Sequence, residues 1–329
     1  MFLAGVVFVL AGPISNAQTP KSKSAIGGAS LAEQATSLAE EGHCTEAMPL
    51  LKKALRQTTA KDMKKRIALD GVHCAMTHDN PFDSLDFLAL LARDFPGDPE
   101  ALYAASHAYS DLSLRASEDL ARQAPFSYQV HELNAEALEL QGKWDEAAAE
   151  YRKILELNPL LPGIHARLGR TLLSRPQPSA ENVDQAKKNF EQELDIDPRN
   201  ATAEYVLGQL AQNANDLSAA IRHYTRASKI DNGFAEAYLG LGMSLISAKR
   251  FTEAIPPLET YEKLAPDSPT GHYQLALAYA GVGRRDDANR EAALQRETAE
   301  SLEKVKRRVA EGLLQEQSEP KAKPPEPQN

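Results

Sequence analysis

Two cysteines are the most reactive side chains in the sequence, and both follow a histidine, in His43-Cys44 and His73-Cys74. The helical pattern places Cys44 at the start of one helix and Cys74 on the next, and consecutive helices of this kind are neighbours. In an exported protein such a pair is expected to form a disulfide, with two buried free thiols as the alternative. A metal site shared by both dipeptides is disfavoured, because adjacent residues on a helix point about 100° apart.

Three histidines stand at one place of a repeat, at His131, His165 and His272. Catalysis would need a nucleophile or carboxylate partner at fixed geometry, and the periodicity explains these histidines as packing residues without one. The sequence also lacks a G-x-S-x-G or H-E-x-x-H motif, a phosphate-cradling loop and a dinucleotide fingerprint. We therefore predict no catalytic residue, no metal site and no cofactor, and expect that the protein is not an enzyme.

The repeat that positions these residues takes its register from the stretch Gln141 to Pro159. An alanine recurs in five copies, first after 39 residues and then three times after 34, because residues 175–179 are an insertion. A fixed period of this length is typical of stacked helix pairs in a solenoid. The five alanines are Ala147, Ala186, Ala220, Ala254 and Ala288, and a bulky or apolar residue follows the first four at Tyr151, Phe190, Tyr224 and Leu258.

The pattern divides the chain into six segments, of which only the middle ones are helical. A shortened third helix pair is expected between Phe95 and Pro125, and clear copies begin at Tyr128. The segments are a signal peptide (1–17), a flexible lead (18–30), degenerate helix pairs (31–127), clear repeats (128–296), a capping helix (297–316) and a disordered Pro-rich tail (317–329).

Composition and charge limit the partners of the protein. The 329 residues are 42% hydrophobic and 25% charged, which is typical of a soluble globular protein. The formal net charge of −9 gives no overall attraction to nucleic acid, so no nucleic-acid partner is predicted. The expected partner is a protein or peptide.

The first residues predict export. An apolar run that is too short to span a bilayer is followed by Ser15-Asn16-Ala17, which places small residues where a signal peptidase cuts. We expect cleavage after Ala17, a periplasmic or extracellular protein, and no stable membrane span afterwards. A cytoplasmic location is the alternative, because no Lys or Arg precedes the apolar run.

Laid out in this register, the copies resemble the tetratricopeptide repeat, whose pattern is W-x2-L-G-x2-Y, then A-x3-F and P. The first-helix positions hold Leu-Gly pairs at residues 168–169, 207–208 and 241–242, and the second-helix positions hold the alanine and aromatic series given above. The resemblance implies an all-α, right-handed superhelical solenoid of about eight antiparallel helix pairs with a C-terminal capping helix. We expect the small residues to let paired helices touch backbone to backbone, while the bulky residue fills the gap.

Members of this family are mostly interaction scaffolds that bind ligands on the concave face formed by first helices. The resemblance therefore implies a scaffold or assembly factor that binds an extended or helical partner segment. Two alternatives stay open: an accessory or regulatory subunit of an envelope enzyme or of polysaccharide or pilus biogenesis, and a hydrolase with an unrecognised site. The residues that the resemblance places on the concave face include Glu132, Glu136, Arg170, Tyr205, Gln209, Met243 and Tyr273.

Overall fold

The computed structural model describes residues 30–77 and 81–318, and within those ranges it contains only helices. Fifteen α-helices and one short 3-10 helix are described there, so the predicted all-α solenoid is confirmed. The expected signal peptide lies outside the described residues, as do nearly all of the expected lead and tail. The chain divides into two compact units after Asp119, and each is described by itself below.

The first unit is built from helices around one apolar core. Its largest fully buried side chains include Leu51, Phe87 and Leu91. A disulfide joins Cys44, the first residue of one helix, to Cys74 of the next, with 5.0 Å between their Cα atoms. The elements are α1 (Leu31–Glu40), α2 (Cys44–Gln57), α3 (Lys61–Thr77), η1 (Pro81–Ser84), α4 (Leu85–Asp94) and α5 (Pro99–Gln123), which runs across the division.

Helix α5 differs from the shortened helix pair expected in this stretch. It is one continuous helix of 25 residues. After Pro99 at its start, the sequence has no Gly or Pro before Pro125, so nothing in it opposes a continuous helix. Several large apolar side chains of α5 are exposed, among them Leu102, Tyr103 and Leu114.

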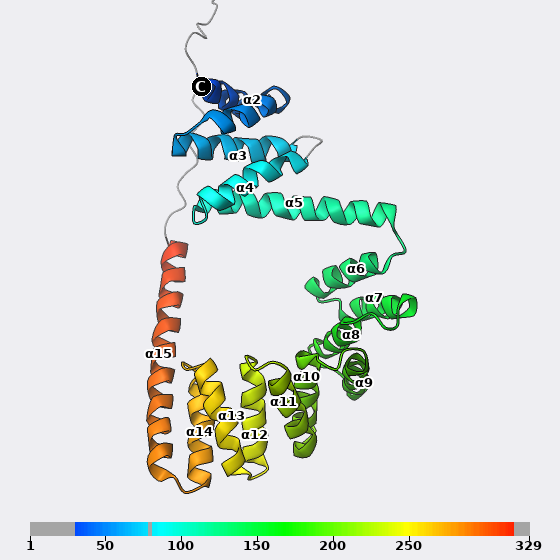
Figure 1. Cartoon of the computed structure of the whole chain (residues 1–329), viewed down its shortest axis with the longest axis vertical. Helices are drawn as coiled ribbons and strands as arrows, with labels where there is room; N and C mark the ends of the chain where they lie inside the picture. Colours follow the sequence, from blue (N-terminus) through cyan, green and yellow to red (C-terminus); the bar gives the residue numbers. More distant parts are fainter. Residues whose placement is uncertain (1–29, 78–80, 319–329) are drawn as a thin grey trace, which may run out of the picture. The chain divides into compact units, whose positions relative to one another are not determined.

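The second unit stacks helix pairs in sequence order (Figure 1). Helix α12 also contacts α10 and α14, so these first helices of successive pairs lie along one face of the stack. The helices are α6 (Tyr128–Leu140), α7 (Trp144–Leu157), α8 (Ile164–Leu173), α9 (Ala180–Ile196), α10 (Ala201–Asn213), α11 (Leu217–Ile230), α12 (Ala235–Ser247), α13 (Phe251–Leu264), α14 (Pro269–Gly281) and α15 (Arg285–Ser318).

One residue in the turn of a repeat takes a left-handed backbone conformation, which reverses the chain between paired helices. Gly142 has φ +70°, and the equivalent Asn215, Lys249 and Gly283 have φ of +57°, +57° and +79°. Glycine adopts this conformation without strain, and a side chain with a Cβ does so at a cost. The position in the repeat therefore determines this backbone conformation, even at Lys249, where the residue type does not favour it.

The last helix, α15, spans 34 residues and unites two expected elements. The sequence predicts a second repeat helix followed by a separate capping helix over residues 297–316. No Gly or Pro lies between Arg285 and Glu311, so the two continue as one helix. None of the helices in the described part of the chain combines the length and apolarity that crossing a membrane would require.

Candidate partner-binding groove

A cavity of about 740 Å³ lies over the first helices α8, α10 and α12 of the second unit. Three of the residues predicted to bind a partner, Tyr205, Gln209 and Met243, line it together. The other lining residues are Leu173, Pro178, Val183, Val206, Leu210, Gln212, Asn213, Ala214, Tyr224, Glu236, Leu239 and Gly240. We refer to this cavity as the α10 groove, because α10 contributes more of its lining than any other helix.

Tyr205 is held in place on the wall of the α10 groove by two other rings. Its ring centroid lies 4.8 Å from that of Phe234 and 5.7 Å from that of Tyr224. The Gln209 amide donates a hydrogen bond of 3.0 Å to the Tyr205 hydroxyl. Burial, together with the charge of Glu236, raises the pKa of Tyr205, so the phenol stays neutral at physiological pH. Tyr205 is therefore a rigid amphipathic surface before any partner binds.

The base of the groove is formed where Tyr224 of α11 inserts between two glycines. A Cβ on Gly208 would lie 2.8 Å from the Tyr224 ring, and one on Gly240 would lie 2.6 Å from it. The Tyr224 hydroxyl donates to the Gln212 side-chain oxygen at 2.8 Å, which fixes the ring. Both glycines thus make room for the bulky ring of the second helix, as expected of the residue that fills the gap between helices.

The chemistry of the α10 groove suits a polypeptide. Leu173, Leu239 and Met243 are partly buried and offer apolar contact. The side-chain amides of Gln209 and Asn213 are exposed, and an amide can both donate to and accept from a peptide backbone. Apolar walls with a few polar groups that fix orientation are characteristic of sites for ligands and peptides.

The structure places the other four predicted residues outside this groove. Glu132 and Glu136 of α6 both form ion pairs with Arg167 of α8, and the Glu132 pair measures 3.4 Å. Hydrogen bonding to Glu136 is the main cause of the raised pKa of Arg167. Arg170 is exposed on α8, and Tyr273 is 52% exposed on α14. The carboxylates of Glu132 and Glu136 are therefore already paired with a cation of the protein itself.

The histidines that the sequence explained as packing residues all have polar partners on the second helix of their pair. His131 Nδ1 lies 2.6 Å from a Glu150 carboxylate oxygen, and His165 Nδ1 lies 2.9 Å from the Asn189 side-chain oxygen. The sequence analysis missed these partners. A signal was present: His131 and Glu150 are 19 residues apart, and the same offset separates His272 from its partner Glu291.

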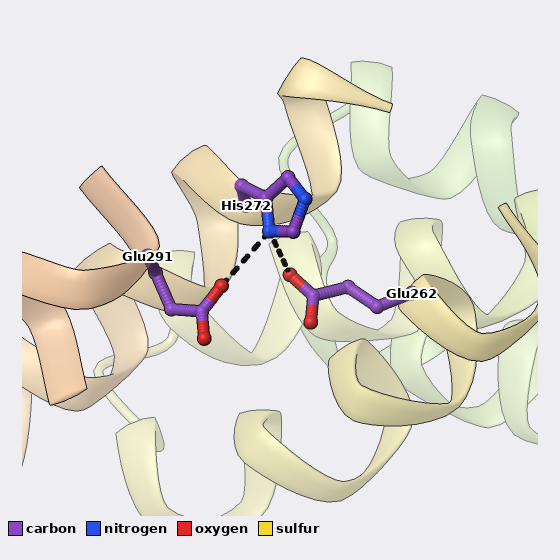
Figure 2. Close-up of side chains that lie close together, drawn as sticks. All are labelled: Glu262, His272 and Glu291. Carbon is purple, nitrogen blue, oxygen red and sulfur yellow. Dashed lines mark hydrogen bonds and ion pairs between the residues drawn. The ribbon is translucent and has the colours of Figure 1, made fainter. Parts of the chain in front are cut away.

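His272 differs from the other two because two carboxylates reach it. Its Nδ1 lies 2.8 Å from Glu291 and 2.7 Å from Glu262, as Figure 2 shows. Burial raises the pKa of Glu262 to about 7, and the charge of Glu291 adds to the rise. No metal-binding group was predicted from the sequence, but these three side chains place possible ligand atoms within 4.8 Å of one another.

Comparison with known proteins agrees with the repeat architecture. The sequence model of the tetratricopeptide repeat matches residues 110–162, 179–233 and 205–269. Anaphase-promoting complex subunit 3 of Schizosaccharomyces pombe is 23% identical over 161 residues, which are 49% of this chain and 23% of that protein. The chain thus spans less than a quarter of the length of that curated relative.

Solved structures that match this chain include those of MamA and YrrB. A MamA structure is 25% identical with a TM-score of 0.49, and the match covers 54% of this chain and 94% of that one. YrrB, described as a TPR protein with an unusual peptide-binding site, is 20% identical with a TM-score of 0.48, over 56% and 92% of the two chains. By its stacked helix pairs, its repeat register and its match to the family sequence model, the chain belongs to the tetratricopeptide-repeat family.

Proposed function

We propose that the protein is a protein–protein interaction scaffold that receives a segment of its partner in the α10 groove. One observation carries the proposal: Tyr205, Gln209 and Met243, which lie on two different helices, line a single cavity. The repeat family to which the chain belongs supports this class of function, since its fold is typically that of a non-enzymatic scaffold. The function is the presentation of a surface, and any catalysis belongs to the partner.

The groove favours an extended or helical segment with apolar anchors. Leu239 and Met243 would take apolar side chains, while Gln209 and Asn213 would pair with backbone groups of the segment. Glu236 is the one carboxylate in the lining, so a neutral or basic segment is favoured over an acidic one. The rigid Tyr205 ring reduces the entropy lost on binding.

Photo-crosslinking tests the groove directly. A photoreactive amino acid placed at Gln209, which is exposed, would capture the partner in an extract of the source cells. The matched control carries the same group at Lys229, which is exposed on the second helix α11. Adducts from position 209 alone support the proposal. Equal adducts from both positions, or adducts from position 229 alone, would exclude the α10 groove as the binding site.

A blocking variant gives an independent measurement with the captured partner. Gln209→Arg adds bulk and positive charge at the rim, and its exposed position should leave folding intact. We expect affinity for the partner to fall at least about tenfold, while Lys229→Ala changes it less than twofold. The identity of the partner separates the two interpretations of the sequence: one stably bound enzyme favours an accessory subunit, and unrelated proteins with a common segment favour a general scaffold.

Export to an oxidising compartment is part of the same proposal. The Cys44–Cys74 disulfide supports it, because such bonds persist mainly in secreted and periplasmic proteins. The apolar run before Ala17 supports it as well. N-terminal sequencing of the protein from cell fractions checks both: a mature chain that begins at Gln18 in an envelope or extracellular fraction is expected. An uncut, cytoplasmic chain with two reactive thiols would reject export.

A further inference from the structure

Three helices at the C-terminal end of the stack direct one potential metal ligand each toward a common point. Glu262 lies on α13, His272 on α14 and Glu291 on α15 (Figure 2). The two carboxylates lie 2.7 Å and 2.8 Å from the same imidazole nitrogen, Nδ1. The side chains of His272 and Glu291 are 9% and 10% exposed, so they are largely removed from water.

The repeat itself explains only two of these three side chains. A polar pair at the same offset of 19 residues occurs at His131 and Glu150, with a separation of 2.6 Å. The third position lies ten residues before the histidine. In two of the preceding copies that position holds Leu155, before His165, and Leu194, before Glu204, and in the copy directly before it holds Ser228, before Tyr238. Both leucines pack against the apolar core. Glu262 is therefore an addition to the repeat pattern, and packing alone does not require it.

One oxygen of the extra carboxylate, Oε1 of Glu262, is left without a hydrogen bond. A neutral imidazole carries one hydrogen at most on Nδ1, and in this structure Nδ1 pairs with Glu291. Glu262 Oε1 is buried and has no hydrogen bond, although it lies within 2.7 Å of the same nitrogen. Leaving a buried charged oxygen unsatisfied is unfavourable unless a cation or a proton compensates it.

We propose that Glu262, His272 and Glu291 bind a divalent transition-metal cation of the Zn²⁺ class. Zinc is bound by imidazole nitrogen and carboxylate oxygen at about 2.0–2.2 Å, which needs ligand atoms roughly 3 Å apart. Small side-chain movements from the present contacts provide that spacing. Calcium and magnesium prefer oxygen-only sites, so the imidazole selects against them.

The surroundings are suited to such an ion. A cavity of about 320 Å³ adjoins the three residues, which leaves room for water as a further ligand. The His272 ring also interacts with the backbone carbonyl of Pro266. A hydrogen bond from Nε2 to that carbonyl would leave the Nδ1 lone pair for the metal, the arrangement common around metal-bound histidines. A bound ion would join α13, α14 and α15, and so brace this end of the stack.

Zinc titration of the full chain, purified without a histidine tag, tests the site. We expect one ion per chain by calorimetry and a melting temperature that rises with zinc. Glu262→Leu installs the residue that two other copies carry at this place, so it should fold. This variant should weaken zinc binding more than about 100-fold, and its metal-free melting temperature should equal or exceed that of the wild type.

Two controls keep the test specific. Glu150→Gln removes a carboxylate from the matched His131 pair and should leave zinc affinity unchanged. His272→Asn should weaken binding as strongly as Glu262→Leu does. Unchanged zinc affinity in Glu262→Leu, an equal loss in Glu150→Gln, or no stoichiometric binding by the wild type would each overturn the proposal.

Discussion

Both units of the chain pack an aromatic ring against a glycine, but they differ in what else stabilises them. In the first unit Gly71 faces Phe87, and a Cβ on this glycine would lie 2.5 Å from the ring; in the second unit Gly240 faces Tyr224 in the same way. Only the first unit contains a disulfide, and both cysteines of the sequence are used in it. The comparison indicates that a covalent bond supports the degenerate pairs, while regular repetition of small and bulky residues suffices for the rest.

Removing the disulfide should have the largest effect on this comparison. The bond closes a sequence separation of 30 residues, so the double variant Cys44→Ala, Cys74→Ala should lose about 3–4 kcal/mol of stability. The loss should fall on the first unit. Urea unfolding followed by far-UV circular dichroism measures it, and the wild type in reductant should behave in the same way.

The single tryptophan provides an internal control. Trp144 lies on α7 in the second unit, so its fluorescence reports on the repeats alone. Its transition should stay at the same urea concentration when the disulfide is removed. An equal shift of the circular dichroism and fluorescence transitions would mean that the two units unfold together. It would contradict the view that the disulfide stabilises the first unit alone.

A second experiment disturbs the packing of the second unit by placing a larger side chain at a glycine that contacts a ring. Gly240→Val adds atoms where even a Cβ lies 2.6 Å from the Tyr224 ring, so overpacking should cost about 2 kcal/mol. The unfolding transition seen by Trp144 fluorescence should move to a lower urea concentration. The unfolding of the first unit, seen by circular dichroism, should stay at the same urea concentration. Ser247→Val, on an exposed position of the same helix, is the control and should change stability by less than about 0.5 kcal/mol. If Gly240→Val unfolds at the same urea concentration as the wild type, the close packing of Tyr224 against Gly240 does not contribute to stability.

Much of the fold followed from the sequence because the repeat fixes which side of each helix is buried. The same register brought Tyr205, Gln209 and Met243 to one cavity. Helix α5 was less predictable, because a degenerate copy without Gly or Pro carries no stop signal within it. Such a helix continues because no Gly or Pro interrupts it. Alignment to a repeat period predicts a turn at that place all the same.

Contacts between successive pairs were the other part that the sequence did not predict. The pairing of Glu132 and Glu136 with Arg167 depends on how far long side chains reach across neighbouring helices. The cluster at His272 needs Glu262 from the preceding pair as well as Glu291 from its own. A repeat alignment compares equivalent positions, whereas these contacts join different positions of adjacent copies.

A titratable group in the first unit offers a smaller, pH-dependent test. Burial raises the pKa of Asp70 from 3.8 to about 6, against the opposing effect of Arg66, and Glu40, His73 and Glu100 act on it more weakly. Its Oδ2 is buried without a hydrogen bond. The folded state binds more protons than the unfolded state between these values, so stability should fall as pH rises from about 4 through 6.

Asp70→Asn should remove this dependence. Since the side chain is only half-buried, solvent screening should limit the gain to about 1 kcal/mol at pH 8, with no gain at pH 4. Circular dichroism melts of the first unit at the two pH values measure it, and the Trp144 signal should not change. A variant that is less stable at pH 8 would show that the carboxylate contributes a favourable interaction there.

The smallest effect is expected at the polar pair of the first clear repeat. His131 and Glu150 contact at 2.6 Å with side chains 18% and 15% exposed, and Glu150 also pairs with Lys153. Glu150→Gln keeps the size and a hydrogen-bonding oxygen, so it should cost only about 0.5 kcal/mol. Trp144 fluorescence reports this change well, because it lies on the same helix. A loss above about 2 kcal/mol would mean that polar pairs, and not the packing of rings against glycines, dominate the stability of the repeats.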